Sequence, residues 1–115
     1  VVSVDSKFQM IIVKSTIGNL SIIGSDKKVG EKIRLRVLAD DISISLSKPS
    51  DTSIMNTFDG LIQSMVEDSS GMTTLNLNIK NDIIKARITT KSVNTLKLKI
   101  NDKVFANIKT VAIIS

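Results

Sequence analysis

Two hydroxyl side chains stand where a predicted strand passes into a short predicted helix. Thr89 ends an alternating apolar run, and Ser92 follows three residues later, inside a helix expected from Thr90 to about Leu96. Backbone N–H groups of a first helical turn lack partners within the helix, and the helix dipole favours negative charge there. Such a junction can hold an oxyanion. From the spacing alone, however, a simple helix cap made by Thr89 or Thr90 is the stronger interpretation.

Two further stretches bring polar side chains to the ends of predicted strands. Ser53 lies in the stretch 52–56, just before the first strand of the second half of the chain, and Lys109 and Thr110 lie in the stretch 108–111, between the last two strands. Hydroxyl and ammonium groups are hydrogen-bond donors, and the ammonium is a cation. These groups suit an anionic ligand better than they suit acid–base chemistry.

The composition argues against catalysis and against a metal centre. The chain has no histidine and no cysteine, which removes the commonest general base, the commonest metal ligand and any thiol nucleophile. The acidic pairs at 40–41 and 67–68 fall in predicted turns, where Asp bonds to the local backbone. The stretch from Gly24 to Lys32 has five residues between its glycines and Glu31 after the second one. It is therefore predicted to be a polar turn and not a phosphate-binding loop. We expect no catalytic residue and no metal site.

The charge points to an anionic partner that is not a nucleic acid. The formal net charge is +5, with a sequence pI of about 9.6, but the Lys and Arg residues are dispersed. A β domain that binds single strands stacks bases on aromatic side chains, and this chain has three Phe, no Tyr and no Trp. The longest unbroken apolar run, Met10 to Val13, is far too short to cross a bilayer. We expect a soluble domain.

Period-two alternation of apolar and polar residues predicts an almost entirely β fold. Strands are expected at residues 1–4, 8–14, 18–23, 32–38, 41–47, 57–66, 72–80, 82–89, 103–109 and 111–115. Hairpin turns are expected at 81–82 and at 39–41, and Gly18 and Gly71 stand where a turn can require positive φ. The only helix expected is the short one after Thr89.

The length of 115 residues suits one modest domain or two small β units that share a core. Pro49, the only proline, separates two alternating runs and predicts a first unit at 1–48 and a second at 52–115. Because the chain opens at Val1 and has no cleavable signal layout, we expect it to come from a longer polypeptide.

The spacing of the motifs in the second unit resembles the Mop domain, also called the TOBE domain. The resemblance rests on Ser53-x-x-Asn56, on Ile88-Thr89-x-x-Ser92 with Leu96 and Leu98, and on Val104, Lys109 and Ile113. The run from Lys32 to Leu46 extends it, since it resembles the segment before the Mop module in ATP-binding subunits of molybdate importers. The implied fold is all-β: two small OB-like β-barrel units packed together, with one short helix in the second.

The resemblance implies an oxyanion site, usually at a subunit interface, that holds molybdate or tungstate through hydroxyls and main-chain amides. Carried over by position, the site residues are Ser53, Thr89, Ser92, Lys109 and Thr110. Many family members have Arg where this chain has Met55, so one cation of the family site is missing. A pocket made of donors suits a fully deprotonated dianion. Sulfate shares that charge, and the sequence does not decide between the oxyanions.

By this resemblance, the chain is the C-terminal regulatory and dimerisation region of the ATP-binding subunit of a molybdate or tungstate ABC transporter. The implied parent is a transport ATPase that docks on a membrane permease at the cytoplasmic face. Its nucleotide domain, which would bind ATP, lies in an absent N-terminal part. The expected assembly is a homodimer. An alternative is a free-standing molybdate-storage protein or the sensor domain of a molybdate-responsive transcription regulator. In those proteins the motifs are expected twice, and here each occurs once. A nucleic-acid-binding barrel is disfavoured.

Overall fold

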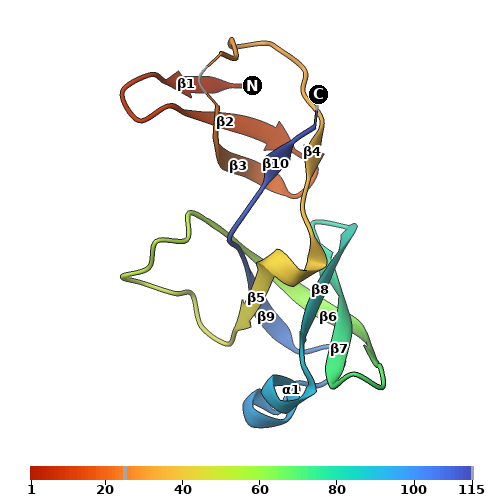
Figure 1. Ribbon diagram of the computed structural model, residues 1–115. Helices are drawn as coiled ribbons and strands as arrows, with labels where there is room; N and C mark the ends of the chain where they lie inside the picture. Colours follow the sequence, from red (N-terminus) through yellow and green to blue (C-terminus); the bar gives the residue numbers. More distant parts are fainter. Residues whose placement is uncertain (25, 115) are drawn as a thin grey trace.

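The computed structural model describes residues 1–24 and 26–114 (Figure 1). Within these residues the chain is mostly β with one short helix, as predicted from the alternation. The strands are β1 (Ser3–Asp5), β2 (Met10–Ser15), β3 (Gly18–Ile23), β4 (Leu35–Arg36), β5 (Ile42–Ser45), β6 (Asn56–Glu67), β7 (Met72–Ile79), β8 (Asp82–Thr89), β9 (Lys103–Ile108) and β10 (Ala112–Ile113). A 3-10 turn, η1 (Ala39–Asp41), precedes β5, and the helix α1 (Thr90–Leu96) follows β8.

A five-stranded antiparallel sheet in the order β5-β9-β6-β7-β8 curls into a half-barrel. Burial along β7 alternates strictly, with Leu75 and Leu77 fully buried, and Val104 and Ala106 of β9 are equally buried. These apolar side chains fill the concave side of the sheet, where their burial stabilises the fold. At Gly60 a Cβ atom would lie 2.9 Å from the carbonyl oxygen of Asn78. Only glycine therefore allows β6 to pass this close to β7.

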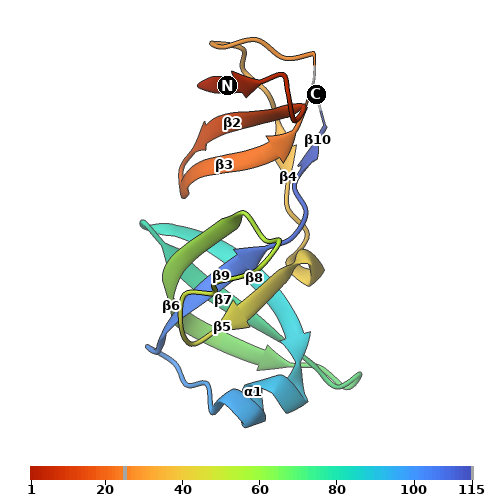
Figure 2. The same cartoon turned by 90° about the vertical axis from the view of Figure 1, so that its left-hand side faces the viewer.

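A second layer consists of the three-stranded sheet β1-β2-β3 and the two-stranded ribbon β10-β4. Figures 1 and 2 place this layer at one end of the half-barrel and α1 at the opposite end. The apolar side chains of the small sheet that face inward are buried: Ile11, Val13, Leu20 and Ile22. They belong to the same hydrophobic core as the half-barrel, so the two layers stabilise each other.

Strands pair across the predicted division at residues 48–52 in both directions. β5, which precedes Pro49, pairs with β9, and β10, which follows it, pairs with β4. Each layer therefore contains strands from both sides of the proline.

The connection between the layers differs from the prediction. The strand expected at 32–38 is a strand only at Leu35–Arg36, because its partner β10 is itself two residues long. The hairpin expected at 39–41 is the 3-10 turn η1, because β4 and β5 belong to different sheets and do not pair. The strand expected at 111–115 spans Ala112–Ile113, and position 115 lies outside the described residues.

The hairpin between β7 and β8 turns one residue earlier than predicted. Its central residues are Lys80 and Asn81, at φ values of 51° and 68°. Two-residue hairpins favour turns in which both central residues have positive φ, because that twist matches the strands. The prediction of positive φ at Gly18 and Gly71 is confirmed, with values of 131° and 86°.

Candidate functional site

Three of the five predicted site residues line one pocket between the two layers. Ser53, Lys109 and Thr110 meet there around a volume of about 370 Å³. Met10, Ser21, Ile22 and Ile23 form the wall contributed by the small sheet, and Met55, Asn56 and Val111 complete the lining. We call this space the oxyanion pocket. Among the described residues that line it, Lys109 is the one charged side chain, so the formal charge of the lining is positive.

The side chains of Ser53, Lys109 and Thr110 are exposed. Within the described part of the chain, no hydrogen bond or ion pair engages these side chains, which leaves their donors available to a ligand. The backbone around them is fixed: Lys109 N donates to Asp41 O at 2.9 Å, and Ile54 N donates to Thr52 Oγ1 at 3.1 Å.

A polar network centred on the buried Asn107 holds the two ends of the loop that carries Ser53. Asn107, 4% exposed, accepts a hydrogen bond from Thr57 Oγ1 at 3.0 Å and donates through Nδ2 to Ser45 Oγ at 3.1 Å. Ser45 Oγ in turn donates to Ser47 O at 2.8 Å. The start of the 46–55 loop and the strand that follows it are therefore tied to β9 by satisfied polar groups, which hold them in one arrangement.

Thr89 and Ser92 do not line the oxyanion pocket. They lie at the junction of β8 and α1, at the end of the half-barrel that is remote from the small sheet (Figures 1 and 2). Because the oxyanion pocket is walled by the small sheet, the structure separates the predicted residues into two groups within one chain. We call Thr89 and Ser92 the helix half-site.

The helix half-site forms the cap predicted from spacing. Thr89 Oγ1 accepts a hydrogen bond from Ser92 N at 3.1 Å and lies 2.7 Å from Ser92 Oγ. One hydroxyl of this pair must donate to the other, so one hydroxyl hydrogen remains free to donate outward. Thr90 Oγ1 lies 2.8 Å from the hydroxyl of the buried Thr73, and this hydrogen bond holds the first helical residue on β7.

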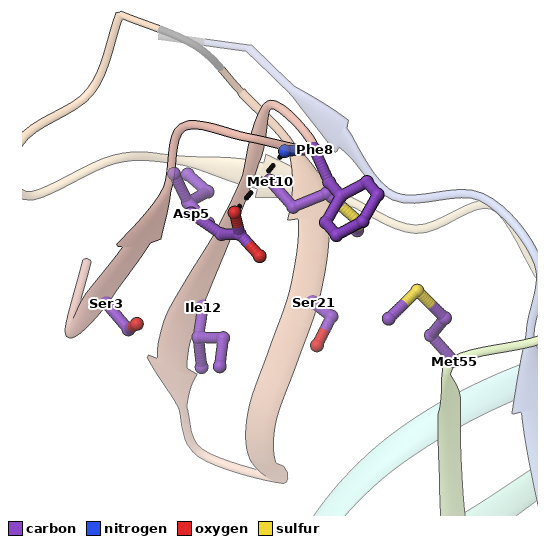
Figure 3. Close-up of a pocket in the computed structure, with 8 residues that line it drawn as sticks. Ser3, Asp5, Phe8, Met10, Ile12, Ser21 and Met55 are labelled. Carbon is purple, nitrogen blue, oxygen red and sulfur yellow. Dashed lines mark hydrogen bonds between the residues drawn. The ribbon is translucent and has the colours of Figure 1, made fainter.

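A second, more apolar pocket adjoins the oxyanion pocket and shares Met10, Ser21 and Met55 with it. Its volume is about 530 Å³. Figure 3 shows Met55 facing Ser21 and Phe8 across this space. The Met55 side chain is 64% exposed and Phe8 is 65% exposed. Phe8 is thus a surface residue at the pocket rim, whereas Phe58 is half-buried against Gly18.

Arg87, two residues before Thr89, links the helix end of the barrel to the connection between the layers. Its guanidinium lies 3.4 Å from Asp40 in η1 and 3.1 Å from Asp68 in the β6–β7 hairpin. Hydrogen bonds from the hydroxyl and amide of Ser70, with further help from Met72 N and Arg87, lower the pKa of Asp68 to about 2. Asp68 therefore acts as a turn residue held in its charged form, as expected for the acidic pairs.

In the 24–32 stretch, predicted to be a polar turn, local contacts occupy the carboxylate of Glu31. Glu31 accepts a hydrogen bond from Lys28 N at 3.1 Å and pairs with Lys27 at 3.5 Å. Across residues 1–24 and 26–114 the structure contains no group of three or more acidic side chains that could hold a metal ion. None of the described helices is long and apolar enough to cross a membrane.

Sequence reasoning missed the contribution of the small sheet to the pocket. Ser21 and Met10 lie more than 30 residues before Ser53, and nothing in their spacing connects them to it. Asn56 was visible as part of the Ser-x-x-Asn motif, but its role was not. Its Oδ1 accepts from Ser21 N at 2.8 Å, and its Nδ2 donates to Ser21 O at 2.9 Å.

Comparisons with known proteins agree with this architecture. The TOBE domain family matches residues 52–114. The chain is 36% identical to the molybdenum import ATP-binding protein ModC of Saccharophagus degradans, over 97% of this chain and 32% of the relative. It is 37% identical to ModC of Albidiferax ferrireducens, over 75% of this chain and 23% of the relative. The chain thus spans a third or less of the length of these curated relatives.

The fold also resembles a solved structure. A crystal structure of the cytoplasmic molybdate-binding protein ModG, with molybdate bound, superimposes with a TM-score of 0.73. The match covers 83% of this chain and 74% of ModG, at 18% identity. At that identity the likeness establishes the fold.

Proposed function

The chain belongs to the TOBE domain family, and from that premise we propose that it is the regulatory and dimerisation region of the ATP-binding subunit of a molybdate or tungstate importer. It binds the oxyanion between two copies of the chain. The parent protein hydrolyses ATP in a separate domain and docks on a membrane permease from the cytoplasmic side. The similarity to two ModC proteins over 97% and 75% of this chain supports this assignment.

The observation that carries the proposal is the separation of the donors into two groups. The oxyanion pocket holds Ser53, Lys109 and Thr110, whereas Thr89 and Ser92 lie at the opposite end of the half-barrel. A two-fold dimer that joins the pocket of one copy to the helix half-site of the other brings all five together, and symmetry then produces two such sites.

The chemistry of these groups suits a tetrahedral dianion. Ser53, Thr110 and the helix half-site offer hydroxyl donors, and Lys109 offers a cationic one. Hydrogen bonds to a charged acceptor are roughly twice as strong as neutral ones. A ligand that carries its own proton, such as hydrogen phosphate, needs a hydrogen-bond acceptor. The Lys109 ammonium only donates, and a hydroxyl that accepts this proton must turn its own hydrogen away from the ligand.

Regulation follows if the two copies in the transporter adopt more than one relative arrangement. An oxyanion held between the copies binds the arrangement that completes the site and shifts the population toward it. The same coupling makes the oxyanion affinity depend on the state of the transporter. We propose that the arrangement favoured by the oxyanion is an inhibited one, so that accumulated molybdate slows further import.

A second candidate is a molybdate-binding protein that acts without an ATPase. The likeness to ModG over 83% of this chain favours it. The sequence upstream of Val1 in the source polypeptide decides between the two: a phosphate loop supports the importer, and a DNA-binding segment or a second copy of the motifs supports the alternative.

Isothermal calorimetry of this chain with molybdate, tungstate, sulfate and phosphate tests the binding. Molybdate or tungstate is expected to bind at one ion per chain, and to raise the thermal midpoint, because a ligand at a hundredfold excess over its Kd stabilises the folded state by about 2.7 kcal/mol. Sulfate and phosphate are expected to do less. Sedimentation equilibrium is expected to give a dimer. A strict monomer that binds no oxyanion overturns the proposal.

A further inference from the structure

The amide side chain of Asn56 makes hydrogen bonds to β3 of the kind that a neighbouring strand would make. It is 7% exposed, and it exchanges two hydrogen bonds with the backbone of one residue, Ser21, 35 positions away. β3 is an edge strand of the small sheet, with β2 on one side only. The outward N–H and C=O of Ser21 need partners when they are buried, and Asn56 supplies both.

This contact lies in the wall of the oxyanion pocket. Ser21 and Asn56 both line it, and Met10, Ile22 and Ile23 come from the same small sheet. The pocket is therefore complete only when the small sheet is docked on the half-barrel.

Among the described residues, the other side-chain hydrogen bond between the small sheet and the half-barrel lies at the β2–β3 turn. There Thr16 Oγ1 donates to Asp82, and Gly18 packs so closely on Phe58 that a Cβ atom would lie 2.8 Å from its ring. Asn56 is thus the polar contact near the pocket, and it is three residues from Ser53 in a continuous segment. Asn56 therefore connects the β3 edge to the segment that carries Ser53.

We propose that Asn56 is a positioning residue that couples oxyanion occupancy to the docking of the β1-β2-β3 sheet on the half-barrel. The inference rests on the proposed function, since it concerns the regulation of the same site. Coupling is reciprocal: the oxyanion strengthens the docking, and a weakened docking lowers the oxyanion affinity. The small sheet is then the element that reports occupancy to the rest of the protein.

Hydrogen exchange of the Ser21 amide, followed by NMR, reads the docking directly, because this amide donates to Asn56 Oδ1. Saturating molybdate is expected to slow its exchange in the native chain by about fivefold or more, the lower end of typical coupling. Asn56→Ala is expected to abolish that slowing and to lower the molybdate affinity by a similar factor. Because Oδ1 and Nδ2 of Asn56 both bond to Ser21, this loss of affinity is expected to act through the docking of the small sheet. Asn78→Ala is the matched control, since Asn78 accepts a bond from Asn81 N in a hairpin outside the oxyanion pocket.

Asn56→Asp provides a second variant of the same size. Its carboxylate still accepts from Ser21 N but cannot donate to Ser21 O, whereas its protonated form does both. The protection of the Ser21 amide in this variant without oxyanion, relative to the native chain at the same pH, is therefore expected to recover as the pH falls through the pKa of the new carboxyl group. Neither general destabilisation nor repulsion of the ligand by the new charge produces this signature.

The outcomes separate this inference from the proposed function. If the native chain binds no molybdate, both are wrong. If the native chain binds molybdate but the Ser21 amide exchanges at the same rate with and without it, the coupling is wrong and the oxyanion site stands. Unchanged affinity in both Asn56 variants has the same meaning.

Discussion

Met55 brings an uncharged, 64% exposed side chain to the rim of a pocket whose one charged lining residue is Lys109. A thioether accepts hydrogen bonds weakly and donates none. In the proposed site, Met55 therefore adds no attraction for the ligand and no repulsion of its charge.

Met55→Arg is expected to tighten molybdate binding by about tenfold, because a guanidinium adds a charge-assisted hydrogen bond of roughly 1.5 to 3 kcal/mol, part of which is offset by ordering the side chain. Calorimetry measures the change. Val66→Arg is the matched control: Val66 is also 64% exposed and lies on β6 outside the pocket. Equal tightening in both variants would mean that net charge, and not the pocket, is responsible.

At the level of single residues, the sequence alone separates hydroxyl and ammonium donors from the rest but does not say which of them meet. Ser53, Lys109 and Thr110 do come together in one chain, whereas Thr89 and Ser92 do not join them. The spacing of the motifs does not say how many chains would build the proposed site. The contribution of Ser21 was not predictable, since its partner Asn56 lies 35 positions away.

At the level of elements, long-range pairing decides what local alternation cannot. Residues 72–79 alternate and form all but the last residue of the strand predicted at 72–80, because β6 and β8 lie on both sides of it. Residues 32–38 alternate equally well, with Lys32, Arg34 and Arg36 exposed, yet only Leu35–Arg36 form a strand. The short partner β10 limits the ladder there. Alternation in the sequence predicts which side chains face the core, and the length of the neighbouring strand limits the length of the ladder.

The β6–β7 hairpin contains a pH-sensitive contact. The pKa of Asp68 lies at about 2, below its ordinary 3.8, because the charged form accepts bonds from Ser70 and Met72 and pairs with Arg87. A lowered pKa means that the charged form is favoured by folding, so its stabilisation is present above about pH 4 and is lost as the pH falls toward 2.

The thermal midpoint of the native chain is expected to fall between pH 4 and pH 2 more steeply than that of Asp68→Asn, which has no carboxylate to protonate at this position. Circular dichroism melts at several pH values measure the difference. Asp51→Asn, at a position that makes no hydrogen bond or ion pair within the described residues, is expected to keep the native pH dependence. If Asp68→Asn also keeps it, the hairpin contact adds nothing to the acid response.

At the level of the whole molecule, the proposed dimer rests on the positions of the two donor groups. They lie at opposite ends of the half-barrel (Figure 2), so the five predicted residues do not meet within one chain. In a two-fold dimer each copy contributes the oxyanion pocket to one site and the helix half-site to the other. This arrangement predicts that two differently disabled chains repair each other.

Ser53→Asp places a carboxylate in the oxyanion pocket, and Ser92→Asp places one at the helix half-site, where an acidic residue in the first turn also suits the helix. Each variant alone is expected to bind no molybdate, because the new charge repels a dianion in both sites of its dimer. In a mixed dimer, one site receives both carboxylates and the other receives neither. Random exchange in an equal mixture makes about half of the dimers mixed, so calorimetry is expected to recover about a quarter of the native number of sites at native affinity. A site built within one chain gives no recovery at any mixing ratio, since every chain then carries a disabling charge. Sedimentation equilibrium on the same samples verifies that both variants remain dimers, so that a failure to recover binding contradicts the shared site and not the assembly.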